Sequence, residues 1–124
     1  MKVVYLAGPL RGKNGWQMEL NIRRAESLSL EVWKLGAACI CPHSMNRFFL
    51  GALGHMGDQA FLNGDFAIIE KCDAILFTSD WKKSTGARAE HKVAKRCGIV
   101  MLYDLDELEA WLVQEEDREM VESF

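Results

Sequence analysis

Four short apolar segments alternate along the chain with longer segments in which apolar residues recur at helical spacing. The apolar segments are residues 2–7, 37–41, 73–78 and 99–103. Short, continuously apolar runs are typical of strands that are buried on both faces of a parallel sheet. Their alternation with helices predicts an α/β domain with right-handed crossovers and helices on both faces of the sheet. At 124 residues the chain suits a single domain, residues 1–124, and is too short for two.

Helical periodicity and capping residues predict four helices and one long loop. The helices are expected at residues 16–35, 57–72 and 85–97 and after the N-cap signature at Asp104. The acidic residues 115–124 are expected to fray. Residues 43–56 show no period, and a loop of this length in a compact domain is usually a lid or a wall of a site. Phe48 and Phe49 within it suit stacking on a base, pinning the loop to the core or filling a subunit interface.

Two carboxylates interrupt the apolar faces of the predicted helices. Glu90 lies on the same helical side as Val93 and Ala94. Asp65 has apolar neighbours three and four residues away in both directions. Because burial of an unpaired carboxylate costs several kcal/mol, each is expected to be hydrogen-bonded, raised in pKa or exposed to a cleft. A structural hydrogen bond is the simpler interpretation, whereas two carboxyls of unlike pKa also suit acid/base work on a glycosidic bond.

A glycine-rich connection follows the first predicted strand, and a turn with Ser84 and Gly86 follows the third. Residues 8–15 contain three glycines and Arg11, a combination that lets backbone N–H groups and a guanidinium approach an anion. The pattern matches neither GxGxxG nor a P-loop, and glycines in such loops often serve only for turning. Asn21 is expected to tie down this loop rather than to contact substrate. If the first and third strands are adjacent, the loop and the turn at Ser84 face one crevice with Glu90 at its floor.

The composition limits the cellular compartment and the kinds of binding partner that are expected. The net charge of −3 disfavours a nucleic-acid polymer as partner, and no segment has the roughly 20 apolar residues of a membrane span. The cysteines lie within or beside apolar runs and are expected to be buried, reduced thiols, which indicates a cytoplasmic protein; they are Cys39, Cys41, Cys72 and Cys97. Zinc at Cys39, Cys41 and His43 is disfavoured, because no second ligand pair lies nearby in the sequence.

Three short motifs occur in order: Val4-Tyr5-Leu6-Ala7-Gly8-Pro9, then Asp65, then Ser84-x-Gly86-Ala87-x-x-Glu90. Over about residues 3 to 103 they resemble the nucleoside 2-deoxyribosyltransferase superfamily. The resemblance implies a flavodoxin-like (Rossmann-like) three-layer sandwich with a parallel sheet of four or five strands. It also implies cleavage of an N-glycosidic bond without metal or cofactor, in a homodimer or larger homo-oligomer whose neighbouring subunit completes the site.

The resemblance assigns roles to individual residues. Glu90 would be the nucleophile, Tyr5 would orient its carboxylate and Asp65 would handle the proton of the leaving base. Ser84 stands where transferases acting on free nucleosides usually carry an Asp. With Gly8-x-x-Arg11-Gly12, this serine resembles the 2'-deoxynucleoside 5'-monophosphate N-hydrolases, in which these groups hold the phosphate. The expected substrate-binding residues are Gly8, Pro9, Leu10, Arg11, Gly12, Asn21, Ser84 and Gly86.

The leading expectation for function is therefore hydrolysis of a (deoxy)nucleoside 5'-monophosphate through a covalent glycosyl-Glu90 intermediate. Base exchange by the same chemistry is one alternative, and a nucleotide-binding or sensing module without turnover is another. The segment from Asp80 to Ala87 also resembles short, uncharacterised phage and bacterial members of the superfamily. An NAD-cleaving glycosidase is a minor alternative, because two phosphates would need a longer anion site than the sequence reveals.

Overall fold

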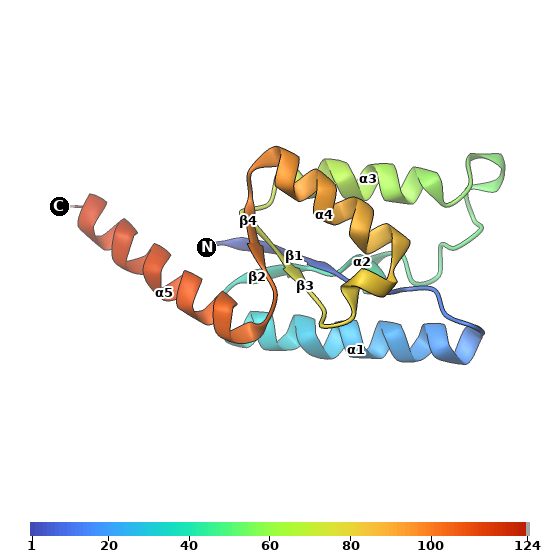
Figure 1. Cartoon of the computed structure of the whole chain (residues 1–124), viewed down its shortest axis with the longest axis horizontal. Coiled ribbons are helices and arrows are strands. Elements are labelled where there is room, and N and C mark those ends of the chain that lie inside the picture. Colours follow the sequence, from blue (N-terminus) through green and yellow to red (C-terminus); the bar gives the residue numbers. More distant parts are fainter. Residues whose placement is uncertain (124) are drawn as a thin grey trace.

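The computed structural model describes residues 1–123 and shows alternating strands and helices (Figure 1). The strands are β1 (Val3–Ala7), β2 (Ala38–Ile40), β3 (Ala74–Phe77) and β4 (Val100–Leu102). The helices are α1 (Gly15–Lys34), α2 (Pro42–Met45), α3 (Gln59–Ile69), α4 (Thr85–Cys97) and α5 (Leu105–Glu122), with 3-10 turns at Gly54–Met56 and Trp81–Lys83. The expected order of elements is confirmed, with the short α2 added inside the segment predicted as a loop.

The four strands form one parallel sheet in the order β2-β1-β3-β4. In this register Tyr5 of β1 lies between Ile40 of β2 and Ile75 of β3. The fold is thus the expected flavodoxin-like three-layer α/β sandwich. Because the chain leaves β1 toward β2 on one side and returns to β3 on the other, the order changes direction between β1 and β3. Ligands of open α/β sheets bind beside such a switch point, at the carboxyl ends of the strands.

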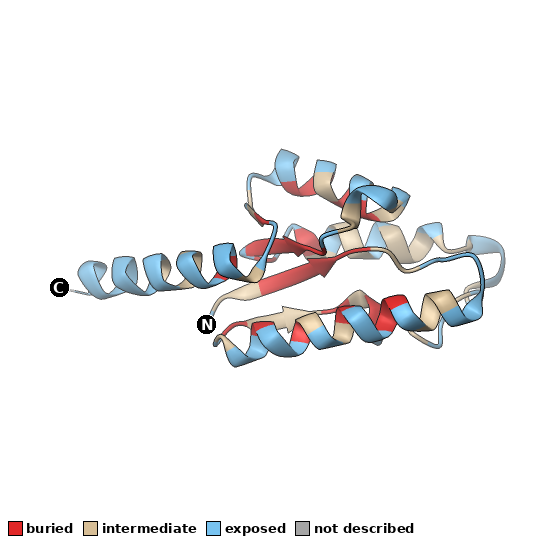
Figure 2. Cartoon of the chain, turned by 60° about the horizontal axis from the view of Figure 1, so that its bottom comes forward, coloured by how far each residue is buried: buried red, intermediate tan, exposed pale blue. Residues whose placement is uncertain are grey.

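The two faces of the sheet are covered by different helices (Figures 1 and 2). Val4 and Leu6 of β1 and Leu76 of β3 pack in the cluster that includes α1 and the start of α5. Tyr5 and Ile75, which point to the opposite face, pack in the cluster with α3 and α4. The alternation of side chains along β1 therefore sends Tyr5 to the same side of the sheet as the helices that carry the two carboxylates.

The C-terminal end of the chain corrects one expectation, because α5 continues through Glu122 instead of fraying from residue 115. The Asp104 side chain caps the helix by accepting a hydrogen bond from the Glu107 N–H at 2.8 Å. Further along, Lys2 forms ion pairs with Glu115 at 3.5 Å and Glu119 at 3.1 Å, which tie the acidic segment to the start of β1. Phe124 lies outside the described residues.

The cysteines agree with expectation except at the end of α4. Cys41 and Cys72 are buried and Cys39 is half-buried, whereas Cys97 is exposed because it lies in the last helical turn, beyond the sheet contact. All four are free thiols. Within residues 1–123, no helix is both long and apolar enough to cross a membrane.

Candidate functional site

A cavity of about 450 Å³ lies at the switch point, and we call it the carboxylate cavity because Asp65 and Glu90 both line it. Its volume is within the range of sites for small-molecule ligands. Eight of the predicted site residues line it: Gly8, Pro9, Leu10, Arg11, Asp65, Ser84, Gly86 and Glu90. The β1–α1 loop (residues 8–14) and the turn before α4 thus face one crevice, as the adjacency of β1 and β3 requires.

Three side chains from different elements meet at the floor of this cavity. Tyr5 of β1 is fully buried, and its hydroxyl donates a hydrogen bond to Glu90 Oε2 of α4. The Glu90 side chain is only 7% exposed, on the inward face of its helix. Asp65 of α3 is half-buried beside them. The predicted catalytic residues are therefore brought together, with Tyr5 behind Glu90 and outside the cavity lining.

Burial gives the two carboxyls unusual and unequal acidities. It raises the pKa of Glu90 to about 8, against a lowering by the Tyr5 hydrogen bond and with a further rise from the Asp65 charge. Burial also raises the pKa of Asp65 to about 6, again opposed by the Tyr5 hydroxyl. Burial and both neighbouring carboxylates push the pKa of Tyr5 far above its ordinary range, so this hydroxyl remains a donor. Near neutral pH the carboxyl pair therefore holds one proton and one negative charge.

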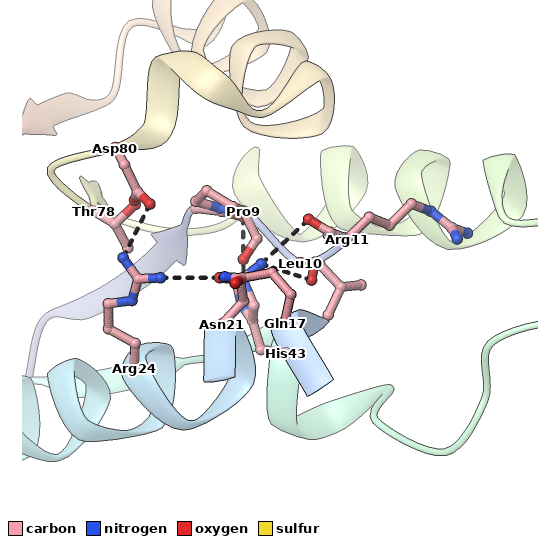
Figure 3. Close-up of polar contacts among 10 residues, drawn as sticks. Pro9, Leu10, Arg11, Gln17, Asn21, Arg24, His43, Thr78 and Asp80 are labelled. Atoms are coloured by element: carbon pink, nitrogen blue, oxygen red, sulfur yellow. Dashed lines mark hydrogen bonds and ion pairs between the residues drawn. The ribbon is translucent and has the colours of Figure 1, made fainter. Parts of the chain in front are cut away.

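The backbone of the β1–α1 loop is held by two side chains that bind its carbonyl groups (Figure 3). The Asn21 amide donates to the carbonyls of Leu10 at 3.1 Å and Arg11 at 3.2 Å. His43 Nε2 lies 3.2 Å from the Gly8 carbonyl and 3.0 Å from the Pro9 carbonyl. Since both partners are acceptors, Nε2 carries the proton, and burial lowers the pKa of this imidazole and keeps it neutral. Asn21 thus ties down the loop, as expected.

His43 is a site residue that the sequence analysis considered only as a metal ligand. It lines the carboxylate cavity, and within the described chain its Nδ1 is buried without a hydrogen-bond partner. A position close after β2, at the same sheet edge as the loop after β1, was the available signal. Within residues 1–123, no group of three His, Cys, Asp or Glu side chains is arranged to hold a metal ion.

Gly8 and Gly86 are suited to their positions for different physical reasons. A Cβ at Gly8 would lie 2.5 Å from the Thr78 side chain at the end of β3, so glycine permits close packing of loop and strand. A Cβ at Gly86 would meet only the Ser84 hydroxyl, at 3.8 Å, so the fold itself does not need glycine there. Gly86 instead leaves room above the first turn of α4, on the cavity side.

The start of α4 presents donors to the carboxylate cavity. Ser84 is the N-cap, and its hydroxyl oxygen accepts from the Ala87 N–H at 3.1 Å. Its hydroxyl proton remains available to a ligand, beside the unpaired N–H groups of the first turn. Lys83 also lines the cavity and adds a cation that the sequence analysis did not assign to the site. A helix N-terminus with a nearby lysine favours an anionic ligand group.

Arg11 and the loop before α3 form the opposite wall. The Arg11 side chain is 65% exposed and pairs with Asp58, a lining residue that the sequence analysis missed. Phe49 stacks on Phe61 with ring centroids 6.3 Å apart, which pins the loop against α3. Phe48 is 85% exposed and lies under the Arg47 guanidinium, 5.5 Å from the ring centroid. Of the three expectations for these phenylalanines, pinning the loop describes Phe49.

Two predicted substrate-binding residues, Gly12 and Asn21, do not line the carboxylate cavity. They lie on the other side of the β1–α1 loop, which Asn21 supports from α1. A Cβ at Gly12 would lie 2.2 Å from the Gln17 side chain, so this glycine permits a close approach between loop and helix. Neither residue can touch a ligand that occupies only the carboxylate cavity.

Comparison with known proteins identifies the family. No curated protein matches the chain. One family matches residues 2–103, which include all four strands and the residues of the carboxylate cavity and end before α5. Because the match covers most of the chain, the protein belongs to the DUF4406 family, described as a domain of unknown function.

Proposed function

We propose that the carboxylate cavity hydrolyses the N-glycosidic bond of a (deoxy)nucleoside 5'-monophosphate. One observation carries the proposal: Asp65 and Glu90 line one cavity from two helices, Tyr5 holds Glu90 from behind, and the rim of the cavity offers cations and helix N–H groups. Their order and spacing also resemble the nucleoside 2-deoxyribosyltransferase superfamily, as described above. A cavity that joins two carboxyls to an anion site suits a sugar with a phosphate at one end and a base at the other.

The proposed reaction has two steps, and Glu90 and Asp65 take part in both. In the first, a Glu90 carboxylate oxygen bonds to the anomeric carbon as the bond to the base nitrogen breaks, and its electron pair stays on the base. Asp65 donates a proton to the departing base. In the second, water attacks the anomeric carbon, Asp65 accepts its proton and the Glu90 carboxylate leaves. The negative charge of the site stabilises the cationic character of the sugar in both transition states.

In the free protein the carboxyl pair holds the one proton that the reaction needs, but this proton is mainly on Glu90 instead of Asp65. One proton on the pair matches one nucleophile and one acid. The higher pKa of Glu90, however, places that proton mainly on Glu90 in the free protein. Substrate binding therefore has to favour its transfer to Asp65, and the partial positive charge of the anomeric carbon beside Glu90 acts in that direction. Tyr5 keeps the Glu90 carboxylate oriented in either state.

The phosphate is proposed to bind at the rim, between the loop after β1 and the start of α4. Ser84, Lys83 and the Arg11 guanidinium supply a hydroxyl donor and two cations there. Arg11 is paired with Asp58 in the free protein, so the phosphate competes with a carboxylate for it. We expect Arg11→Ala to raise KM for a monophosphate far more than for the free nucleoside; equal changes would exclude a phosphate role for Arg11.

We also propose that the protein is a homo-oligomer, as the superfamily resemblance implies. The segment from α2 to the turn before α3, part of which walls the cavity, exposes several large apolar side chains, namely Met45, Phe48, Phe49 and Met56. A second copy of the chain over this segment would remove them from water and cover the open side of the cavity. Light scattering after size-exclusion chromatography measures the mass directly, and a monomer across micromolar concentrations would exclude the oligomer.

The experiment that tests the function is release of free base, followed by chromatography. Wild type and Glu90→Gln are incubated with ribo- and deoxyribonucleosides and their 5'-monophosphates, each with and without a second base as acceptor. We expect wild type to release base from monophosphates, and Glu90→Gln to be slower by about a thousandfold or more. Glu70→Gln is the matched control, because Glu70 is exposed and lies outside the cavity.

The other outcomes separate the alternatives. Base exchange that requires the acceptor would assign the protein to the transferases. No release from any substrate, with measurable nucleotide binding, would overturn the proposal in favour of a binding or sensing module. In that case Glu90→Gln would lower affinity instead of rate, because the carboxyl would act as a hydrogen-bond partner of the sugar or base.

A further inference from the structure

A second hollow of about 720 Å³ lies on the other side of the β1–α1 loop. We call it the basic hollow, because four of its lining side chains are cationic and one is acidic: Arg11, Lys13, Arg24 and Lys83 against Asp80. The cations come from the loop, from α1 and from the turn before α4, and they converge only in the folded protein. Such an excess of positive charge around one concave surface attracts an anion.

Part of the basic hollow is rigidly built (Figure 3). The Arg24 guanidinium pairs with Asp80 at 3.1 Å and donates to the Asn21 side-chain oxygen at 3.0 Å. Asp80 also accepts from the Thr78 hydroxyl at 2.8 Å, so its charge is already engaged. Asn21 is buried and held by the loop carbonyls. These contacts place the Arg24 charge in a fixed position, which lowers the entropy lost when an anion binds.

Two of the remaining cations of the basic hollow, Lys13 and Lys83, are free to bind, whereas Arg11 is paired with Asp58. Within residues 1–123, neither Lys13 nor Lys83 forms an ion pair. Lys83, Pro9 and Arg11 line the carboxylate cavity as well, so the two spaces adjoin at these residues. An anion bound in the basic hollow would therefore lie next to the phosphate proposed at the rim of the carboxylate cavity.

We propose that the basic hollow binds a further phosphoryl group, so that a nucleotide with a second phosphoryl group on its 5'-phosphate binds more tightly than the monophosphate. The identification of the group as part of the substrate rests on the proposed function. Two consecutive phosphoryl groups of one nucleotide match two adjoining spaces that share Arg11 and Lys83. A single phosphate in the carboxylate cavity would make no contact with Lys13 or Arg24, which line only the basic hollow. A nucleoside diphosphate, a nucleoside triphosphate and a dinucleotide share this chemistry.

The test is a binding comparison that does not depend on turnover. Calorimetry with Glu90→Gln measures Kd for a nucleoside 5'-monophosphate, the corresponding diphosphate and triphosphate, a pyrophosphate-linked dinucleotide and inorganic pyrophosphate. We expect the diphosphate to bind at least about tenfold more tightly than the monophosphate. Adding Lys13→Ala should remove most of that advantage and leave monophosphate affinity unchanged, because Lys13 lines only the basic hollow. Lys95→Ala, an exposed change outside both spaces, is the control.

Equal affinities for the monophosphate and the diphosphate would overturn the proposal, as would an advantage that survives Lys13→Ala or one that Lys95→Ala removes equally. Tight binding of inorganic pyrophosphate alone, without a gain for any nucleotide, would also overturn it as a substrate site. Dinucleotide binding tighter than diphosphate binding would identify the dinucleotide as the source of the second phosphoryl group. Failure of wild type to release base from any of these ligands would refute the proposed hydrolysis but would leave a measured diphosphate preference standing.

Discussion

The two faces of the sheet carry different kinds of residues, although the same strands supply both. Between the sheet and α1 and α5, the buried cluster consists of aliphatic and small side chains, including Val4, Leu6 and Leu76. Between the sheet and α3 and α4, an equally buried layer contains the Tyr5 hydroxyl and the Glu90 carboxyl. One face therefore stabilises the fold at any pH, whereas the other keeps a titratable group out of water at a cost that depends on pH.

The difference between the faces indicates that the α1/α5 face serves mainly stability, whereas the α3/α4 face carries the groups suited to chemistry. Burial of an ionised carboxylate is unfavourable, so the α3/α4 face is less stable than it would be with a neutral group. Such a cost is typical of functional sites, where a local arrangement is retained for chemistry and supported by the rest of the fold. Variants on the two faces should therefore respond differently to pH.

The largest expected effect is a gain of stability from Glu90→Gln at alkaline pH. Burial raises the pKa of Glu90 from 4.5 to about 8. Between these values the unfolded chain releases the proton while the folded protein retains it, so wild-type stability falls as pH rises through this window. Glutamine has no such loss, so the variant should gain about 5 kcal/mol over wild type between acidic and alkaline conditions. Urea unfolding at a series of pH values measures the gain.

Glu70→Gln is again the control for this experiment, because its side chain is exposed on the last turn after α3. Its stability should follow that of wild type at every pH. If the difference between Glu90→Gln and wild type is the same at all pH values, the Glu90 carboxyl does not keep its proton on folding.

The opposite face should show a large loss that is independent of pH. Leu76→Ala removes a fully buried side chain from the cluster under α1, and the cavity left behind should cost about 3 kcal/mol. Urea midpoints measured in the same pH series check this. A loss that varies strongly with pH would mean that the two faces are coupled, and the comparison between them would no longer hold.

Two glycines of the site provide a smaller, matched contrast. Gly8→Ala places a methyl group against the Thr78 side chain and should lower stability by about 2 kcal/mol. Gly86→Ala meets only the Ser84 hydroxyl, so its stability should change by less than about 0.5 kcal/mol. The methyl group added by Gly86→Ala enters the ligand space, however, and should raise KM for the monophosphate about tenfold. If Gly86→Ala leaves KM unchanged, substrate does not approach the start of α4.

Much of the fold follows from patterns that are local in the sequence. Each strand is a short apolar run, and α4 occupies the residues that its periodicity and the capping residues Ser84 and Gly98 indicate. The four-residue α2 was missed because so short a segment has no measurable period. The extension of α5 to Glu122 was missed because it is supported by Lys2, from the other end of the chain.

The residues of the candidate site likewise divide into those that the local sequence pattern predicts and those that only the folded structure reveals. Asp65 and Glu90 could be predicted because a carboxylate on an apolar helical face is visible in the local pattern. His43 and the basic hollow could not, because each depends on residues from separate segments that meet only after folding. Lys83, by contrast, directly precedes the predicted Ser84, and that neighbour was the available signal. The β1–α1 loop shows both cases: its approach to Asn21 was expected, whereas its contact with His43 was not.

The last prediction concerns the pH dependence of base release. If the pair must hold one proton, kcat/KM should be highest between the pKa of Asp65, about 6, and that of Glu90, about 8, and fall about tenfold per pH unit outside. Asp65→Asn leaves Glu90 as the only carboxyl and removes the charge that raises its pKa. The slower reaction of this variant should therefore rise with pH to a single plateau, with a midpoint below that of Glu90 in wild type.

A matched variant tests whether the His91 imidazole, next to Glu90 in the sequence, contributes to this pH profile. His91→Gln changes an imidazole that packs against Trp81 and Tyr103 and does not line the carboxylate cavity, and it should leave the bell shape intact. Burial is the main cause that lowers the pKa of this imidazole. A bell that survives Asp65→Asn unchanged would show that the proton does not belong to the carboxyl pair. Asp65 would then have a structural rather than a catalytic role, and the proton donor of the reaction would lie outside the carboxyl pair.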